Sequence, residues 1–306
     1  MRILITGVTG FLGRHMARRL LAQGHDVTGI ARHAPPEALP EGLRFVPASI
    51  EDASVTGPLL AASDWLIHLA WDTTPGSSQG LPSRESAANI LPTALLLEEL
   101  QSHPSCSVMF VSTGGALYPG NGEPAEETSP LLPRSYYGAA KGAVELMLQA
   151  LAEQAGNRVV VLRPSNVYGP GQPAKAGFGV IPALMRCALQ DQEFEVWGSG
   201  STGRDYLYIE DFLDLAQSAL SWQCEGRAFG VLNAGSGSLV SIDELCERVS
   251  GISGRPLGRR VIGARAVDPP RILLDSRRAL QLLGWSARVS IGEGLALTWR
   301  WWQERT

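Results

Sequence analysis

Cysteine and histidine are scarce in this chain of 306 residues, which has four of the first and five of the second. No CxxC pair and no histidine at ligand spacing accompanies the widely separated cysteines, which are Cys106, Cys187, Cys224 and Cys246. This spacing argues against a zinc site and a disulfide framework, and favours small core residues in a reducing compartment. We therefore expect no metal centre.

Basic runs and long apolar runs are also missing. The net charge is −4, so nucleic acid is not an expected partner. No apolar run approaches the length of a membrane span, and the start of the chain, MRILITG, lacks the features of a signal peptide. These absences predict a soluble cytoplasmic protein with no membrane partner. Its 44% hydrophobic residues suffice for one large α/β unit, or for a main domain with a smaller lobe.

The N-terminal region has the order strand, glycine-rich turn, helix, strand. Residues 2–6 are a continuous apolar run, an amphipathic run over 11–22 predicts a helix, and 25–31 reads as a second strand. Between them, Gly7, Gly10 and Gly13 permit a tight turn and let backbone amides approach a pyrophosphate at a helix N-terminus. The order predicts a dinucleotide site in an α/β fold with a Rossmann-type, doubly wound parallel sheet.

The rest of the chain continues this alternation. Further strands are predicted at 43–48, 65–70, 107–112, 158–163 and 194–197, and helices at 83–101, 177–190, 211–222 and 241–250. Residues 120–133 are rich in Gly, Pro and Glu without a period, which predicts a loop. We expect an NAD(P)-binding Rossmann domain over 1–170. The composition shifts afterwards, so 171–306 are expected to form mainly a smaller substrate-binding lobe, with some chain crossing back.

One helical run, which opens with SYYGAAK over 135–141, carries the candidate catalytic pair. In a helix Tyr137 and Lys141 share one face, and a lysine ammonium beside a phenol lowers the pKa of that phenol. The pair would then exchange a proton with an alcohol or sugar hydroxyl. The alternative is a packed ring beside a solvated charge. Tyr136 is less suited than Tyr137, because the residue four positions further on is Ala140.

The GxxGxxG turn together with Tyr137-xxx-Lys141 resembles the extended short-chain dehydrogenase/reductase family, and within it the UDP-glucose 4-epimerase group of NAD-dependent epimerases and dehydratases. This resemblance covers nearly the whole chain. It implies an NAD or NADP cofactor, a nucleotide-diphosphate sugar as substrate, and a homodimer. The implied reaction is epimerisation at C4 of a hexose, through a transient 4-keto intermediate and hydride transfer with bound NAD(P).

The resemblance also implies which residues hold the cofactor. Arg32 stands where NAD-using relatives carry an acid for the ribose, and a guanidinium there would attract a 2′-phosphate, so the choice between NAD and NADP stays open. Asn89 matches an asparagine near the nicotinamide, although a helix-surface amide is the alternative. The full expected set is Gly7, Thr9, Gly10, Phe11, Leu12, Gly13, Arg32, Ile50, Leu69, Ala70, Trp71, Asn89, Tyr137, Lys141 and Pro164.

A catalytic hydroxyl is expected at the end of the strand over 107–112. Counted back from Tyr118, the position that relatives use falls on Gly114, so Thr113 is the preferred candidate and Ser112 the second. A short hydroxyl there can orient a sugar hydroxyl and relay its proton. Gly114-Gly115 replaces the Asp-Glu of sugar 4,6-dehydratases, which argues against that activity. His68 is expected to be a core histidine.

Three residues are expected to bind the substrate. Asn166 lies in a turn that resembles the diphosphate-binding turn of nucleotide-sugar enzymes, and Arg204 and Arg265 match two arginines of a diphosphate clamp. A turn amide and two surface charges are the alternatives. Two other activities stay open: an NADPH-dependent nucleotide 4-keto-sugar reductase using the same residues, and a catalytically silent dinucleotide-binding sensor.

Overall fold

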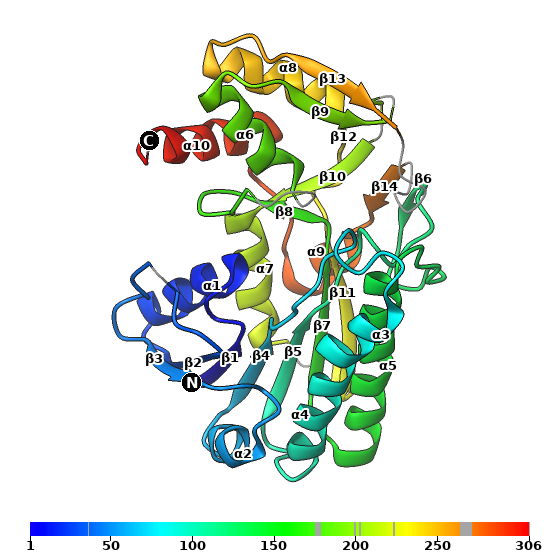
Figure 1. Cartoon of the computed structure of the whole chain (residues 1–306). Helices are drawn as coiled ribbons and strands as arrows, with labels where there is room; N and C mark the ends of the chain where they lie inside the picture. Colours follow the sequence, from blue (N-terminus) through cyan, green and yellow to red (C-terminus); the bar gives the residue numbers. More distant parts are fainter. Residues whose placement is uncertain are drawn as a thin grey trace. The chain divides into compact units, whose positions relative to one another are not determined.

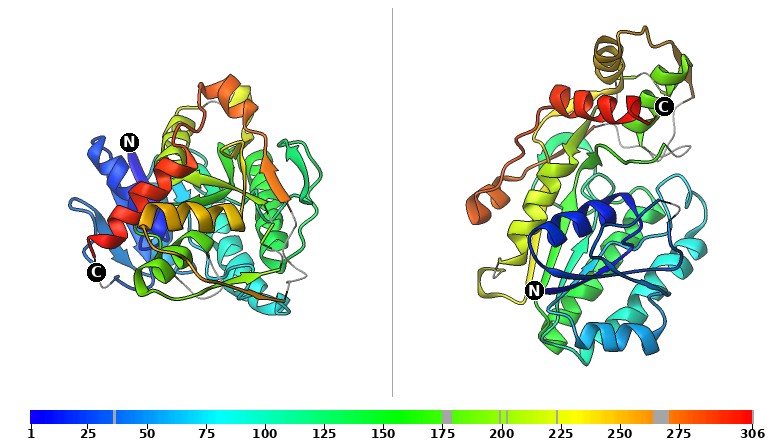
Figure 2. Two further views of the ribbon diagram at one scale, coloured as in Figure 1. Left: turned by 90° about the horizontal axis from the view of Figure 1, so that it is seen from above. Right: turned by 90° about the vertical axis from the view of Figure 1, so that its left-hand side faces the viewer.

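The computed structural model describes residues 1–35, 37–174, 179–198, 200–201, 203–222, 224–263 and 271–305 (Figure 1). These residues form two compact units. The first unit consists of Met1–Thr113, Ser135–Arg163 and Ala216–Leu232, and the second of Gly114–Arg134, Pro164–Leu215 and Asn233–Thr306. Figures 1 and 2 show the N-terminus in the first unit, at the start of β1, and the C-terminus in the second, at the end of α10.

A seven-stranded sheet forms the centre of the first unit. Its spatial order is β11 (Phe229–Ala234), β7 (Val159–Pro164), β5 (Ser107–Val111), β4 (Trp65–His68), β1 (Arg2–Thr6), β2 (Asp26–Ala31) and β3 (Arg44–Pro47). The pairings from β3 through β7 are parallel. Strand order reverses beside β1, because β2 lies on one side of it and β4 on the other. Ligands of open α/β sheets bind at the carboxyl ends of strands at such a point.

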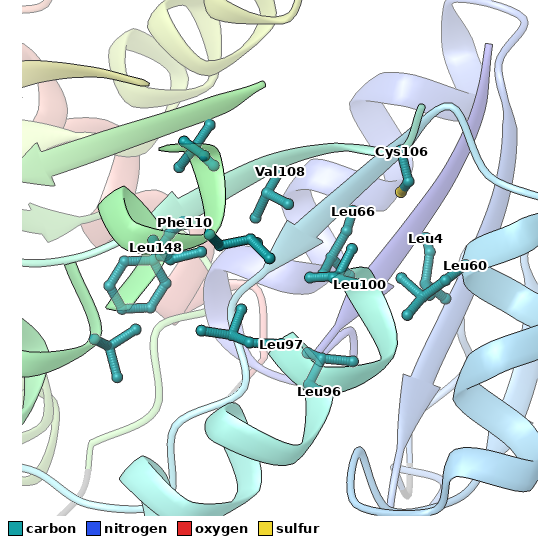
Figure 3. Packing of buried hydrophobic residues seen from close by; sticks show 14 of the residues in the cluster. Leu4, Leu60, Leu66, Leu96, Leu97, Leu100, Cys106, Val108, Phe110 and Leu148 are labelled. Carbon is teal, nitrogen blue, oxygen red and sulfur yellow. The ribbon is translucent and has the colours of Figure 1, made fainter. Parts of the chain in front are cut away.

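Helices cover both faces of this sheet. α2 (Ala53–Ala61), α4 (Leu91–Gln101) and α5 (Tyr136–Ala155) cover one face, where their leucines pack on β1, β4 and β5. Figure 3 shows this core, with Leu60, Leu96, Leu97, Leu100 and Leu148 against Leu4, Leu66, Val108 and Phe110. α1 (Phe11–Ala22) packs against β1 and β2, and buries Met16, Ala17 and Leu20. This arrangement confirms the predicted Rossmann-type fold.

Two local features of the first unit place residues of interest. The predicted helix over 83–101 is α3 (Pro82–Glu85), a π-helical turn (Ser86–Ile90) and then α4. α5 begins where predicted, because the Ser135 hydroxyl accepts a hydrogen bond from Gly138 N at 3.1 Å and caps the helix.

The short 3₁₀ turn η2 (Cys224–Gly226) follows α7 (Ile209–Leu220), whose residues are divided between the two units.

The second unit contains short strands with distant partners. Its five-stranded sheet consists of β12 (Leu239–Ser241), β10 (Gly203–Tyr208), β14 (Arg271–Leu274) and β6 (Asn121–Ala125), with β8 (Asn166–Tyr168) paired to β10. β9 (Phe194–Trp197) pairs with β13 (Arg259–Ile262). Its remaining helices are α6 (Val180–Gln190), α8 (Ile242–Ser253), α9 (Arg277–Leu283) and α10 (Ile291–Gln303). No helix among the residues described has the length and apolar character needed to cross a bilayer.

Along the chain, the segments of the two units alternate more often than the predicted boundary after residue 170 implies. Residues 114–134 and 164–170 group with the second unit, because β6 pairs with β14 and β8 pairs with β10. The expectation of a structureless loop over 120–133 is wrong, since β6 lies within it. Its strand pairing comes from a segment that follows it by about 150 residues in the chain, so no local pattern indicated it.

Candidate functional site

The glycine turn after β1 forms a tight cradle. Gly7 has a φ of +69°, and a Cβ on Gly7 would lie 2.7 Å from the backbone nitrogen of Ala70, after β4. A Cβ on Gly13 would overlap the carbonyl oxygen of Gly7. No side chain among the described residues caps α1, and its first turn has no acid, so its amides suit an anion. The cradle therefore fits the pyrophosphate of NAD(P).

The other residues expected around the cofactor also lie in the first unit, with one exception. Thr9, Leu12 and Leu69 lie in or next to the turns after β1 and β4, Phe11 packs edge-on against His15, and Ile50 packs on the core. Pro164 belongs to the second unit.

Arg32 follows β2 and is held by an acid. Its Nη2 donates to Oδ1 of Asp72 at 2.5 Å, and both side chains are exposed. A 2′-phosphate would compete with Asp72 for this guanidinium. The pairing therefore weakens the sequence argument for NADP, and the phosphate preference stays a prediction.

Tyr137 and Lys141 share the first turns of α5, but the ammonium does not lie against the phenol. Lys141 Nζ donates to the carbonyl oxygen of Val111 at 2.9 Å and lies 3.8 Å from the centroid of the Trp71 ring. It lies 6.0 Å from the centroid of the Tyr137 ring. Burial lowers the pKa of Lys141 to about 7, although Glu145 and Glu85 counteract this.

The expected lowering of the pKa of Tyr137 is wrong for this arrangement. Burial raises that pKa above its ordinary value, and the negative charge of Glu85 raises it further. Helical spacing correctly placed Tyr137 and Lys141 on one face. It could not show that the Lys141 ammonium turns toward Trp71 and a strand carbonyl.

Sequence reasoning missed Glu85, a carboxylate with only 2% of its surface exposed. Its Oε1 accepts hydrogen bonds from Trp71 Nε1 at 3.1 Å and Asn89 Nδ2 at 2.8 Å, and both carboxylate oxygens accept from Thr73 Oγ1 at 2.8 Å. Asn89 Oδ1 in turn accepts from the backbone nitrogen of Asp72 at 2.7 Å. Asn89 is therefore not a surface amide. The spacing of four residues between Glu85 and Asn89 was the available signal.

His68, at the end of β4, is the expected core histidine. Thr93 Oγ1 donates its hydrogen to the carbonyl oxygen of Asn89, so this hydroxyl accepts the hydrogen bond from His68 Nε2 at 3.2 Å. The other ring nitrogen, His68 Nδ1, accepts a hydrogen bond from Thr6 Oγ1 at 2.7 Å. Burial lowers the pKa of His68 to about 3, so the ring is neutral near pH 7. Thr6 Oγ1 also accepts from the backbone nitrogens of Leu69 and Ala70, which fixes the turn opposite Gly7.

The structure explains why glycine stands where relatives carry a hydroxyl. A Cβ on Gly114 would lie 2.5 Å from Cδ1 of Leu274, whose buried side chain fills that position. Of the two predicted alternatives, Thr113 is partly exposed. The hydroxyl of Ser112 is buried and has no hydrogen-bond partner among the described residues. Both lie at the end of β5 in the first unit, and their roles stay predictions.

Two of the three expected substrate residues, Asn166 and Arg204, lie in the second unit. Asn166 begins β8 and Arg204 lies on β10, its parallel neighbour. Asn166 Nδ2 donates to the carbonyl oxygen of Asp205 at 3.0 Å, and Arg204 Nη1 donates to that of Gly203 at 3.0 Å. Arg265 lies outside the described residues. The structure thus brings together two of the three residues predicted for the diphosphate.

Comparison with known proteins identifies the family. The sequence profile of the NAD dependent epimerase/dehydratase family matches residues 3–235. The chain belongs to this family. A UDP-glucose 4-epimerase of Mycolicibacterium smegmatis is 32% identical over 307 residues, covering 97% of each chain.

Solved structures of this epimerase/dehydratase family have the same fold. The UDP-glucose 4-epimerase of Thermotoga maritima, determined with UDP-glucose, is 30% identical with a TM-score of 0.93, over 100% of this chain and 99% of that one. The UDP-glucose 4-epimerase of Thermus thermophilus, in complex with NAD, is 28% identical with a TM-score of 0.92 and full coverage of both chains. The predicted family and its NAD(P) cofactor class are therefore confirmed. The roles of individual site residues stay predictions.

Proposed function

We propose that this family member is a nucleotide-sugar 4-epimerase, which inverts C4 of a hexose carried on a nucleoside diphosphate. The observation that carries the proposal is the helical pair Tyr137 and Lys141 on α5, in the same unit as the glycine cradle. Its similarity to UDP-glucose 4-epimerases along nearly the whole chain supports this activity. The first unit would bind the cofactor and the second mainly the substrate.

NAD(P), when bound in the cradle, supplies the oxidation and the later reduction at C4. Tyr137 takes the proton of the sugar 4-hydroxyl and returns it after inversion. Tyr137 accepts this proton as a phenolate, and Lys141, as an ammonium, stabilises that phenolate before the transfer. Thr113, or Ser112, orients the hydroxyl that reacts.

Inversion requires that the 4-keto sugar turn its other face before it is reduced. The protein must therefore hold the substrate by a group that stays still while the sugar ring moves. Asn166 and Arg204 suit this task, because an amide and a guanidinium bind phosphate oxygens well. Arg265 is the third proposed contact.

The decisive experiment incubates purified protein with UDP-glucose or UDP-galactose without added cofactor, and follows interconversion of the two sugars. Tyr137→Phe should lower kcat by about 100-fold or more, because it removes the proton-transfer group. Tyr136→Phe is the matched control, since its side chain is 46% exposed and should leave kcat unchanged. Net oxidation of NADPH, strictly coupled to a 4-keto sugar, would instead indicate the reductase. Dinucleotide binding without either turnover would indicate the sensor.

We also propose a cytoplasmic homodimer, in which α4 and α5 of two copies pair. Leu91 on α4 and Leu146 on α5 support this, because they are 53% and 68% exposed. Analytical ultracentrifugation of the wild type and of Leu146→Glu tests it, and a monomeric wild type refutes it.

A further inference from the structure

Lys141 is a buried cation that forms no ion pair with a carboxylate of the described residues. Only 4% of its surface is exposed, and its one hydrogen bond among the described residues goes to the carbonyl oxygen of Val111. Its other contacts are aromatic rings, with Nζ 3.8 Å from the centroid of Trp71 and 4.7 Å from that of Phe110. A buried ammonium needs a compensating negative charge.

Two carboxylates act on Lys141, and one of them already has a cation. Arg163 binds Glu145 with two nitrogens, Nη2 to Oε2 at 2.6 Å and Nε to Oε2 at 3.1 Å, and both side chains are buried. The charge of Glu145 is therefore balanced by Arg163. Glu85 receives hydrogen bonds only from neutral groups within the described part of the chain: an indole, a hydroxyl and an amide. Its charge is the one left to balance Lys141.

Glu85 also reaches the catalytic pair through a shared ring. It accepts the hydrogen bond of the Trp71 indole N–H, which fixes the orientation of that ring. The face of the ring lies against the Lys141 ammonium, as in other cation–π contacts. Tyr137 packs against the same ring edge-on, with centroids 6.1 Å apart and an interplanar angle of 80°. One carboxylate therefore orients the surface on which both catalytic side chains rest.

We propose that Glu85 is a positioning residue for Tyr137 and Lys141, which holds the Trp71 indole against the ammonium and supplies the charge that balances it. This inference rests on the proposed function of the pair. His68 on β4, whose pKa Lys141 also lowers, stays neutral near pH 7 and adds no charge. Glu145 raises the pKa of Lys141 more than Glu85 does, but Glu145 is paired with Arg163, so among the described residues Glu85 is the carboxylate near Lys141 whose charge no cation pairs with.

The pH dependence of kcat tests this role. In the wild type the negative charge of Glu85 raises the pKa of both Lys141 and Tyr137. Glu85→Gln keeps the shape of the side chain and most of its hydrogen bonds but removes that charge, so both pKa values should fall. The two apparent pKa values that define the limbs of the kcat profile belong to the coupled pair, and both should move to lower pH by about one unit. A merely structural role would lower kcat at every pH without moving the profile, and that result overturns the proposal. Glu98→Gln, on the exposed face of α4, is the matched control and should leave the profile unchanged.

The orientation of Trp71 has its own readout. In ¹⁵N NMR spectra the Trp71 indole signal, assigned from its loss in Trp71→Phe, should move upfield in Glu85→Gln, because a neutral acceptor binds N–H more weakly than a carboxylate. The other indole signals should stay in place. A Trp71 signal that does not move overturns the assigned contact.

A double-mutant cycle in urea separates this inference from the proposed function, because it needs no activity. At pH 6, where Lys141 is charged, Glu85→Gln should lower the urea midpoint more in the wild type than in Lys141→Met. Equal shifts overturn charge balance even if the enzyme is an epimerase. If the single variant Glu85→Gln does not fold but the double variant with Lys141→Met does, the proposal is strongly supported. If neither the single nor the double variant folds, Glu85 has a structural role alone and the proposal is overturned.

Discussion

Replacement of Lys141 by methionine should change how the stability of the protein depends on pH. In the folded protein burial lowers the pKa of Lys141 from 10.5 to about 7, whereas the unfolded chain keeps the higher value. Between these two values the unfolded chain binds more protons, so stability rises with pH. The stabilisation is complete above the unfolded pKa, and is lost as the pH falls through about 7. Lys141→Met removes this titration.

The size of the effect follows from the displacement of the pKa. One pKa unit corresponds to about 1.4 kcal/mol, and the excess of protons that the unfolded chain holds at this position rises from about half a proton at pH 7 to nearly one above pH 8. With a folded value of about 7, integration over this interval gives a gain of about 2 kcal/mol in the free energy of unfolding of the wild type relative to Lys141→Met.

The assay is urea denaturation of both proteins at pH 7, 8 and 9. Burial raises the pKa of Cys106 to about 12 and that of Cys246 to about 11, so these thiols begin to titrate in this range only in the unfolded chain. Their effect occurs in both proteins and cancels in the difference. The difference in the free energy of unfolding should therefore grow steadily in favour of the wild type. A difference that stays constant or shrinks over this range would show that Lys141 is not desolvated as the structure indicates, and would refute the reasoning.

Three further substitutions have expected outcomes. Gly114→Ser should destabilise the protein by about 1–3 kcal/mol in urea denaturation, because its Cβ meets Leu274 at 2.5 Å, and should cost less in a Leu274→Val background. Gly13→Ala should weaken NAD(P) binding more than 10-fold by calorimetry, because its Cβ meets backbone atoms that cannot yield. Arg163→Met should cost about 3–5 kcal/mol in urea denaturation, because it leaves the carboxylate of Glu145 buried and unpaired.

Each of these outcomes has a control in the chain. Gly251→Ala, in an open position on α8, should leave NAD(P) binding unchanged, and an equal loss there would remove the argument from the Gly13 contact. Arg2→Met breaks the exposed pair with Asp64, which water screens, and should cost much less than Arg163→Met. If Arg2→Met and Arg163→Met cost the same, burial is not what makes the Arg163 pair important. If Gly114→Ser lowers the free energy of unfolding by the same amount in the Leu274→Val background as in the wild type, the steric explanation is refuted.

Much of the first unit could be predicted because its signals are local. The helix over 11–22 and the strand over 2–6 were predicted with the bounds that the structure shows, from periodicity and the glycines between them. The cap at Ser135 and the capping box of Ser241 and Glu244 are likewise encoded within four residues. In the second unit, β10 and β14 were not predicted, because short strands are defined by partners far away in the chain.

The errors at the candidate site have one physical origin, since they concern where charges lie after folding. Spacing placed Lys141 beside Tyr137, but the direction of its ammonium depends on Trp71 and Val111, which come from other segments. Glu85 was missed because a carboxylate in a predicted helix is usually a solvated residue, and only tertiary contacts show that it is buried.

The charges buried around α5 determine whether Tyr137 can lose its proton without a bound ligand. Arg163 balances Glu145, and in our proposal Glu85 balances Lys141, so the two pairs leave no net positive charge to favour a phenolate. Burial and Glu85 both raise the pKa of Tyr137, which therefore keeps its proton near pH 7. Release of that proton needs positive charge beyond what these four side chains provide. In the proposed mechanism Tyr137 would therefore act as a base only once binding brings further positive charge, which would limit proton transfer to the assembled complex.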